Sequence, residues 1–186
     1  MTNTWFTSDT HFGHARIIEL CNRPFDSVDA MNEAIIDNWN AVVKPADIVF
    51  HLGDVAMGTL VESLPLVNRL NGHKVLVPGN HDRVFAGNKK AYRDRFLPQY
   101  RDTFDNVIML GRYVFDDEIV LCHFPYEGDS HEEDRFVDHR PFDNGDWLIH
   151  GHVHDSWKIR GRQINVGVDV WDFTPVDLDQ ILEVMK

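Results

Sequence analysis

Three short apolar runs in the first half of the chain each lead directly into a cluster of polar side chains. The runs cover Thr4–Ser8, Asp47–Leu52 and His73–Pro78. Short apolar segments that are rich in β-branched or aromatic residues and end at glycine or proline predict buried strands. The polar residues that follow the three runs are, in chain order, Asp9-Thr10-His11, Gly53-Asp54 and Gly79-Asn80-His81-Asp82. Side chains able to bind metal ions therefore stand at the ends of predicted strands.

Helices are predicted between these strands. Apolar residues recur at helical spacing across Val28–Val42, and Ser27 is placed as the N-cap. A second helix is predicted from Thr59, which has capping-box spacing to Glu62, although Pro65 disfavours its continuation. The order strand, helix, strand, helix, strand indicates parallel pairing of the strands.

The pattern changes after a polar helix predicted near Asn88–Phe96. Short strands then follow one another with tight turns, and a last helix is predicted over Asp177–Val184. The predicted strands are Val107–Leu110, Tyr113–Phe115, Ile119–Cys122, Trp147–His150, Trp157–Ile159 and Gln163–Val166. We expect this half to be largely antiparallel. The predicted fold class is α/β, with two mixed β-sheets packed as a sandwich flanked by helices, in a single domain over residues 1–186.

Composition narrows the classes of function. The 186 residues include 18 lysines and arginines against 30 acids, a formal net charge of −12, which disfavours polymeric nucleic acid as a partner. No apolar run approaches the roughly 18 residues of a membrane span, and the first residues lack the pattern of a secretory signal. Cys21 and Cys122 are far apart and form no CxxC pair, which fits a reducing cytoplasm.

Two pairs of ligand-type side chains share an i, i+2 spacing. They are Asp9 with His11 and His152 with His154. In an extended chain this spacing puts both side chains on one side, about 6–7 Å apart. Two ions about 3.5–4 Å apart could then each take one ligand of a pair. Asp54 has two carboxylate oxygens with which it could bridge both ions.

The remaining polar residues at the strand ends suit the same chemistry. Asn80 offers a carbonyl oxygen and His123 an imidazole nitrogen. Aspartate, asparagine and histidine without a thiolate favour manganese, iron or zinc over copper(I) or an iron–sulfur cluster. His81 is better placed as a proton donor, because imidazole titrates near neutral pH and can protonate a departing alkoxide. Bound ions would polarise a phosphoryl group and activate water as the nucleophile.

These motifs, taken in order, resemble the signature of the calcineurin-like metallophosphoesterases. The resemblance rests on Asp9-x-His11, Gly53-Asp54, Gly79-Asn80-His81-Asp82, His123, Gly151-His152-Val153-His154 and the trailing Asn165-Val166-Gly167. The start Asp-Thr-His-Phe-Gly-His is similar to that of small bacterial and phage members. The resemblance implies a sandwich of two mixed sheets with the site at the strand ends.

The resemblance also implies a role for each residue. One divalent ion would be held by Asp9, His11, Asp54 and His154. The second would be held by Asp54, Asn80, His123 and His152. Mn²⁺ is the favoured metal, with Fe²⁺, Fe³⁺ or Zn²⁺ as alternatives. His81 would be the catalytic acid beside the leaving group.

One position departs from the family pattern. Many members carry a second acid three residues after the bridging aspartate, where it orients the catalytic histidine, and here that position is Met57. Asp82 and His14 are the candidates to support His81 instead. His14 follows Gly13 close to the first ligand pair, so contact with a substrate phosphate is its other predicted role.

The leading functional hypothesis is a metal-dependent phosphodiesterase that hydrolyses small diesters such as cyclic nucleotides. Its rivals are a phosphomonoesterase or protein phosphatase with the same site, and a scaffold of the same fold without catalysis. Trp171 and Phe173 could stack on a nucleobase, although closing the core is the favoured role for both. The expected partner is a small phosphodiester or phosphomonoester, and the sequence leaves a dimer open.

Several other segments carry two interpretations. His51 and His150 are expected to pack or hydrogen-bond around the ligands rather than to bind metal. Cys122 is expected to be a buried strand residue rather than a ligand. The basic residues of 89–95 either attract phosphates or form a solvated helix face, and the second is favoured. Gly128–Arg135 is predicted to be a loop at the rim of the site.

Overall fold

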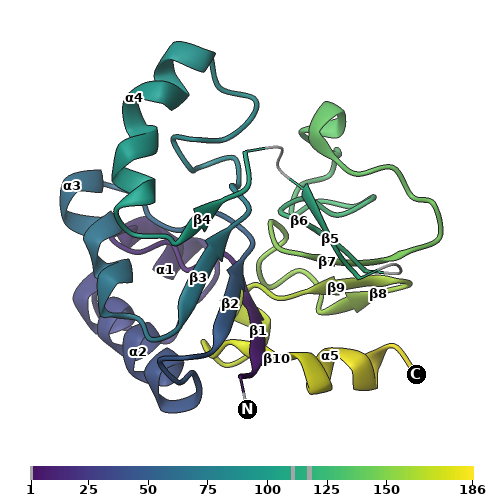
Figure 1. The fold of residues 1–186 in the computed structure, drawn as a ribbon, viewed down its shortest axis with the longest axis horizontal. Coiled ribbons are helices and arrows are strands. Elements are labelled where there is room, and N and C mark those ends of the chain that lie inside the picture. Colours follow the sequence, from purple (N-terminus) through teal and green to yellow (C-terminus); the bar gives the residue numbers. More distant parts are fainter. Residues whose placement is uncertain (1, 110–111, 117–118) are drawn as a thin grey trace.

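The computed structural model describes residues 2–109, 112–116 and 119–186, and over these ranges it contains two five-stranded sheets (Figure 1). The first sheet has the order β10 (Val176–Asp177), β1 (Thr4–Thr7), β2 (Ile48–His51), β3 (His73–Leu76), β4 (Asn106–Val107). The second has the order β5 (Arg112–Asp116), β6 (Ile119–Cys122), β7 (Trp147–His150), β9 (Gln163–Asn165), β8 (Ile159–Arg160). The predicted class, α/β with two mixed sheets and flanking helices, is confirmed.

Strands β1 to β4 pair in parallel in their chain order, and β10 joins the edge of β1 in antiparallel fashion. Parallel neighbours need crossover connections, and these contain helices that lie on the side of the first sheet away from the second (Figure 1). The connecting helices are α1 (Ala15–Leu20), α2 (Val28–Val42), α3 (Leu60–Ser63), the 3₁₀ helix η1 (Leu64–Arg69) and α4 (Lys90–Arg101). Helix α5 (Leu178–Val184) follows β10.

Local sequence explains where several helices begin and end. The Ser27 side chain accepts a hydrogen bond from the backbone N–H of Ala30 and caps α2, as expected. The capping box predicted at Thr59 is wrong, because the Thr59 side chain makes no capping hydrogen bond. Helix α3 passes into 3₁₀ geometry at Leu64, directly before Pro65, whose nitrogen has no hydrogen to donate.

The second sheet corrects the expectation of a largely antiparallel second half. Strands β6, β7 and β9 pair in parallel, and only β5 and β8 join it in antiparallel fashion. Residues 123–146 separate β6 from β7, which is long enough for the chain to return to the same end of the sheet. This connection includes the 3₁₀ helix η2 (Val137–His139), and η3 (Val168–Val170) follows β9.

The strand predicted at Val107–Leu110 belongs elsewhere than expected. Of its described residues, Val107 alone lies in a strand, and that strand, β4 (Asn106–Val107), completes the first sheet beside β3 rather than opening the antiparallel half. Leu110 lies outside the described residues. The helices in the described part of the chain are too short or too polar to cross a bilayer.

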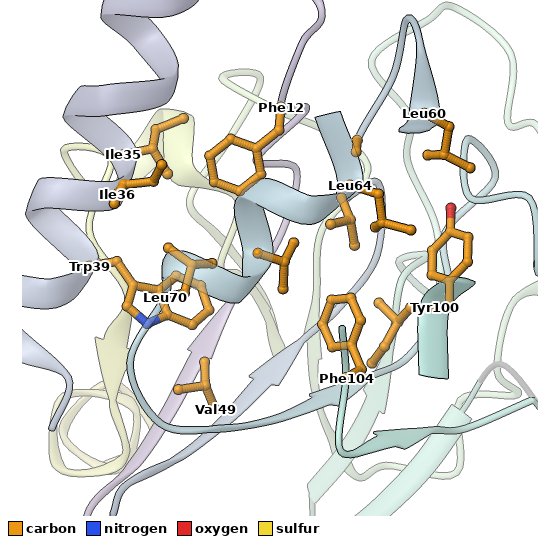
Figure 2. Packing of buried hydrophobic residues seen from close by; sticks show 14 of the residues in the cluster. Phe12, Ile35, Ile36, Trp39, Val49, Leu60, Leu64, Leu70, Tyr100 and Phe104 are labelled. Carbon is orange, nitrogen blue, oxygen red and sulfur yellow. The ribbon is translucent and has the colours of Figure 1, made fainter. Parts of the chain in front are cut away.

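Along the central strands of the first sheet, side chains alternate between two cores, as the pleat requires. Trp5 of β1 packs under the helices, whereas its neighbour Phe6 packs between the sheets. Figure 2 shows the helix-side core. In it, Trp39 of α2, Leu64 of η1 and Tyr100 of α4 pack in one cluster with Val49 of β2. The carboxyl ends of the parallel strands in the two sheets lie at neighbouring edges.

Candidate metal centre

The predicted ligands meet where the parallel strands of both sheets end. The backbone N–H of Asp9 donates to Gly53 O at 3.0 Å, and that of His11 donates to Asp54 O at 3.1 Å, which joins the segments after β1 and β2. The second sheet is tied in by the backbone N–H of His152, which donates to Asp9 Oδ2 at 3.0 Å. Residues separated by more than 140 positions thus come together in one centre.

The ligand pairs reach this arrangement through turns rather than extended backbone. Positive φ angles occur at Asp9 (58°), His11 (51°), Asp54 (56°), His152 (71°) and His154 (50°). The argument that i, i+2 pairs project from an extended strand is therefore wrong, because each pair lies in the loop after its strand. Left-handed backbone is costly for residues with a Cβ and gathers at functional sites, where the surrounding fold enforces it.

Asp54 occupies the middle of the cluster. Its Oδ2 lies 3.7 Å from His11 Nε2 and 3.5 Å from His123 Nε2. The same His123 nitrogen lies 3.2 Å from Asn80 Oδ1. Ligand atoms of Asp9, His11 and His154 lie within 4.8 Å of one another, and so do those of Asp9, Asp54 and His123. One carboxylate thus faces both predicted groups of ligands.

Buried polar atoms without partners test whether cations fit here. Among the described residues, Asp9 Oδ1 and both ring nitrogens of His11 are buried and make no hydrogen bond. Asp9 Oδ1 lies 3.9 Å from His11 Nε2. Buried polar atoms normally find partners because leaving them unpaired costs free energy. A divalent cation between these atoms would satisfy them, so the donor set fits the expected metals.

Hydrogen bonds orient the rings of two of the predicted histidine ligands, His123 and His154. His123 Nδ1 donates to Leu52 O at 2.7 Å and so leaves Nε2 toward Asn80 and Asp54. His154 Nδ1 donates to Asp169 Oδ2 at 3.2 Å. A metal-binding histidine is commonly held in this way by a carboxylate or carbonyl on its other nitrogen.

Asp169 belongs to a buried pair that the sequence did not reveal. The Arg23 guanidinium donates to both Asp169 oxygens, at 2.7 and 2.9 Å. It also donates to Asp9 O at 2.8 Å and to Thr10 O at 3.1 Å. Arg23 therefore connects the strained turn that carries Asp9 with the carboxylate that orients His154. The sequence gives only the proximity of Asp169 to the Asn-Val-Gly motif as a signal.

The rim loop predicted at Gly128–Arg135 reaches the centre through Asp129. Its Oδ2 lies 3.1 Å from His152 Nε2. Arg135 donates to Asp129 Oδ1 at 2.7 Å, and the buried Arg140 donates to Oδ2 at 3.2 Å. Burial acts to raise the pKa of Asp129, but the hydrogen bonds from Arg135, together with His152, hold it below its usual range. Asp129 was not recognised from the sequence, because nothing local distinguishes it from the acids beside it.

Asp82 supports the loops rather than the imidazole of His81. Its carboxylate accepts hydrogen bonds from the backbone N–H groups of Asp54, Val55 and Gly79, at 2.9, 3.2 and 2.8 Å. The backbone N–H of His81 donates to Asp54 Oδ1 at 2.8 Å, and its ring lies across that of His11, with centroids 5.5 Å apart. The His81 side chain remains 44% exposed.

His14 stays a predicted substrate contact. Its ring centroid lies 5.4 Å from that of His11, so it borders the centre. Its Nδ1 is buried and has no hydrogen-bond partner among the described residues. Burial, together with the nearby His81, lowers the pKa of His14.

The other histidines next to strand ends behave as expected. His51 Nε2 lies 3.0 Å from Thr10 Oγ1, and its Nδ1 accepts a hydrogen bond from Gly53 N–H at 3.2 Å, so it braces two of the ligand loops. Burial lowers the pKa of His51 to about 3 and keeps it neutral. His150 is also buried, with its ring against Trp157.

Three further predictions concern the surroundings of the centre. Trp171 packs against the core between the sheets and Phe173 against the helix-side core. Cys122 is buried in β6. In the basic segment, Lys90 pairs with Asp94 on the exposed face of α4, as a solvated helix face would.

The charges of the centre act strongly on one another. Burial disfavours the Asp54 carboxylate, but His123 outweighs it and holds the pKa of Asp54 well below its usual range. Burial also acts to lower the pKa of His123, whereas Asp54 raises it to about 9. For His154, the hydrogen bond to Asp169 overcomes burial and raises the pKa to about 11. Protons and metal cations compete for this negative charge, so ion binding releases protons.

A cavity of about 400 Å³ opens beside the centre. Its lining includes the predicted ligand Asn80 and its neighbour His81, together with Met57. The cavity is within the size range of small-molecule sites, which is about 300–1,000 Å³. His81 therefore stands between the ligand cluster and a space that can hold an organic group.

The chain is similar to a known protein family and to several known proteins. The family described as calcineurin-like phosphoesterase matches residues 2–156. Gene 66 protein of Mycobacterium phage L5 is 37% identical, with 92% of this chain and 88% of that protein covered. Protein MJ1445 of Methanocaldococcus jannaschii is 35% identical, with 100% and 93% covered.

One solved structure shares the fold across the whole chain. It is the crystal structure of AQ665 from Aquifex aeolicus, a protein of unknown function. The TM-score is 0.75 at 28% sequence identity, and the match covers 99% of this chain and 100% of AQ665. The overall fold is thus shared with an experimentally determined structure.

Proposed function

The chain belongs to the calcineurin-like phosphoesterase family, and we propose that it hydrolyses small phosphodiesters, with cyclic nucleotides as the leading candidates, using two divalent cations. The carrying observation is the position of Asp54 Oδ2, between His11 Nε2 at 3.7 Å and His123 Nε2 at 3.5 Å. A carboxylate shared in this way suits two adjacent ions.

The residues divide into two sets around Asp54. Asp9, His11 and His154 would hold one ion with it, and Asn80, His123 and His152 would hold the other. When bound, the ions would supply Lewis-acid activation of the phosphoryl group and of the attacking water. Mn²⁺ is the first metal to test, and iron or zinc are its alternatives.

His81 supplies the proton that the leaving group needs. Water adds its oxygen to phosphorus and releases a proton to solvent, the bond from phosphorus to the leaving oxygen breaks, and that oxygen takes a proton from the protonated His81. The half-exposed ring faces both the ligand cluster and the cavity, so a leaving group placed in the cavity lies next to the acid. Asn80, the residue before His81, lines the cavity and is also a proposed metal ligand, so the cavity adjoins the centre.

Two observations support a small diester. The cavity beside His81 can hold an organic substituent, whereas its volume suits a small molecule better than a polymer. The net charge of −12 also opposes polymeric nucleic acid.

The substrate class is tested with the purified Mn²⁺-loaded protein. Chromogenic phosphodiesters and phosphomonoesters are compared at equal concentration, followed by a panel of cyclic nucleotides. We expect higher kcat/KM for the diesters. Faster turnover of monoesters would favour a phosphomonoesterase or protein phosphatase, and no turnover with full metal occupancy would favour a scaffold.

The general-acid role is tested with His81→Ala, and His73→Ala serves as a control on an exposed histidine at the start of β3. His81→Ala should lower kcat most for leaving groups of high pKa, because these depend most on proton donation. An equal loss for all leaving groups would contradict the role.

A further inference from the structure

The cavity beside His81 has an unusual charge for this protein. Its walls come from the segment after β2, the segment after β3 and the first turn of α4. Among the described residues that line it, Arg83 and Lys89 are basic and Asp82 is the one acid. The Asp82 carboxylate is buried against backbone N–H groups of the ligand loops. The cationic side chains therefore dominate the accessible wall, in a chain with 30 acids and 18 bases.

Arg83 is held in place without a carboxylate. Its Nη1 donates to the hydroxyl of Tyr92, which also lines the cavity. The guanidinium carbon lies 6.0 Å from the Tyr92 ring centroid and 5.7 Å from that of Phe96. Such contacts restrain a guanidinium while leaving some of its donors unused. No ion pair of Arg83 with an acid is present among the described residues.

Lys89 adds a second positive charge at the same cavity. It is the N-cap residue of α4, whose first turn contains no acid, so the positive end of the helix borders the cavity. Its neighbour Lys90 is different, because Lys90 is neutralised by Asp94 at 2.5 Å. Arg83 and Lys89 thus differ from ordinary surface cations in facing a cavity next to the proposed acid.

The rest of the lining is apolar or neutral. Ala56, Met57 and Leu60 offer apolar surface, and Asn88 uses its amide to hydrogen-bond Asp82 O at 3.2 Å. A ligand that matches these walls has an apolar body and an anionic end. His81 would lie at the side of the cavity nearest the ligand cluster.

We propose that this cavity is the leaving-group subsite and that it selects leaving groups that carry an anionic group, either carboxylate or phosphate. The proposal rests on the proposed function, because His81 protonates the leaving oxygen and so fixes the side on which the leaving group lies. Arg83 and Lys89 bind the anionic end, since a guanidinium and an ammonium are complementary to carboxylate and phosphate oxygens. Among small diesters, this subsite therefore favours acyclic phosphodiesters whose departing alcohol is itself anionic over cyclic nucleotides, whose departing oxygen carries no further anionic group.

The test uses matched aryl phosphodiesters with the Mn²⁺-loaded protein. In one the leaving group is 4-hydroxybenzoate, and in the other it is the methyl ester of the same phenol, which removes the negative charge. A third diester with a phosphonomethyl group tells carboxylate from phosphate selection. We expect kcat/KM for at least one anionic substrate to exceed that for the neutral ester by about tenfold, which is about 1.4 kcal/mol.

Variants then assign this preference to the cavity. Arg83→Gln and Lys89→Gln should each reduce the ratio of anionic to neutral kcat/KM severalfold, whereas Lys90→Gln should leave the ratio unchanged. A second measurement does not depend on turnover: calorimetric titration with 4-hydroxybenzoate should show binding to the native protein that Arg83→Gln weakens.

The outcomes separate the two proposals. Hydrolysis of the esters with equal kcat/KM, and a ratio that Arg83→Gln does not change, would overturn the anionic subsite and leave the phosphodiesterase function standing. Absence of hydrolysis for all three diesters would overturn the phosphodiesterase function, and loss of 4-hydroxybenzoate binding in Arg83→Gln would still support an anion site in the cavity.

Discussion

At the scale of single residues, Arg23 and Asp169 show how the centre is kept in position. They are 146 residues apart, and both are buried. Arg23 holds the carbonyl groups of Asp9 and Thr10, while Asp169 holds His154 through Nδ1. A buried ion pair is seldom a net source of stability, because both charges lose their hydration. We interpret this one as a positioning pair for one of the two proposed ions.

The first prediction concerns Asp169→Asn. The change removes the negative charge that aligns His154, and outer carboxylates of this kind typically affect metal affinity by about 10–100-fold. Calorimetric titration with Mn²⁺ should show weaker binding at one of two sites, with the other site little changed. Asp172→Asn, on the exposed side of the same segment, is the matched control. Thermal unfolding of the metal-free variant shows whether the fold persists, and unaltered affinity at both sites would contradict the positioning role.

The second prediction concerns Asp47, at the end of β2 away from the centre. Its carboxylate accepts hydrogen bonds from Asn3 N–H at 2.9 Å, Trp5 Nε1 at 3.0 Å and Lys44 N–H at 2.9 Å. The two backbone hydrogen bonds lower the pKa of Asp47. A carboxylate with a lowered pKa stabilises the fold above its unfolded-state pKa of about 3.9, and this stabilisation is lost as pH falls through the lower, folded-state pKa.

Asp47→Asn should therefore destabilise the protein at pH 7, and the difference from the native protein should shrink as pH falls below about 4. Urea unfolding of both proteins between pH 7 and pH 3 measures this difference in the free energy of unfolding. Asp179→Asn is an exposed control. If the difference in the free energy of unfolding did not vary with pH, the charge of Asp47 would not contribute to stability.

At the scale of elements, the loops after β2 and β3 are packed against each other. Gly53 has a φ of +92°, and a Cβ there would lie 2.2 Å from the backbone nitrogen of Gly79. Asp82 then joins the same loops by accepting hydrogen bonds from Asp54 and Gly79. The two loops are thus packed and hydrogen-bonded to each other, so the positions of Asp54 and Asn80 depend on each other.

The third prediction compares two glycines with positive φ. Gly53→Ala should destabilise the fold severely and weaken Mn²⁺ binding, because the backbone of Gly79 cannot give way. Gly161→Ala has the same kind of φ, +59°, but nothing lies within 4 Å of its Cβ, so it should cost only about 1 kcal/mol. Chemical denaturation of both variants measures the difference. Equal losses would mean that the close approach of the loops is not required.

At the scale of the whole molecule, the centre joins the two sheets. Asp9, Asp54 and Asn80 follow strands of the first sheet, whereas His123 and His152 follow strands of the second. Bound cations would cross-link the carboxyl ends of both sheets. Anything that binds the folded state alone also stabilises it by mass action.

The fourth prediction is that Mn²⁺ raises the Tm and that a chelator lowers it again. At a free concentration about 100 times Kd, each site adds about 2.7 kcal/mol to the free energy of unfolding. Asp54→Asn should remove most of the increase, since Asp54 serves both sites, whereas Asp172→Asn should keep it. Differential scanning calorimetry at several Mn²⁺ concentrations tests this. A Tm independent of Mn²⁺ would contradict a two-ion centre.

Much of the fold and of the candidate centre was accessible from local sequence. The apolar runs that became β1, β2 and β3 are short and bounded by turn residues, and the helix over Val28–Val42 has both its spacing and its cap. The predicted ligands come together because each directly follows a strand. The second sheet was harder, because strand direction depends on where long connections return and short strands carry no mark of it.

The identity and order of the polar residues at the strand ends were determined by the sequence alone, and with them the family and the residues proposed to hold metal ions. Tertiary structure decided the rest: the left-handed turns at the ligands, the parallel pairing of β6, β7 and β9, and the cation-lined cavity beside His81. It also decided that Arg23 meets Asp169 and that Asp129 reaches His152. The physical reason is that these features depend on contacts between distant segments, and a local pattern encodes only what a residue's neighbours in the chain require.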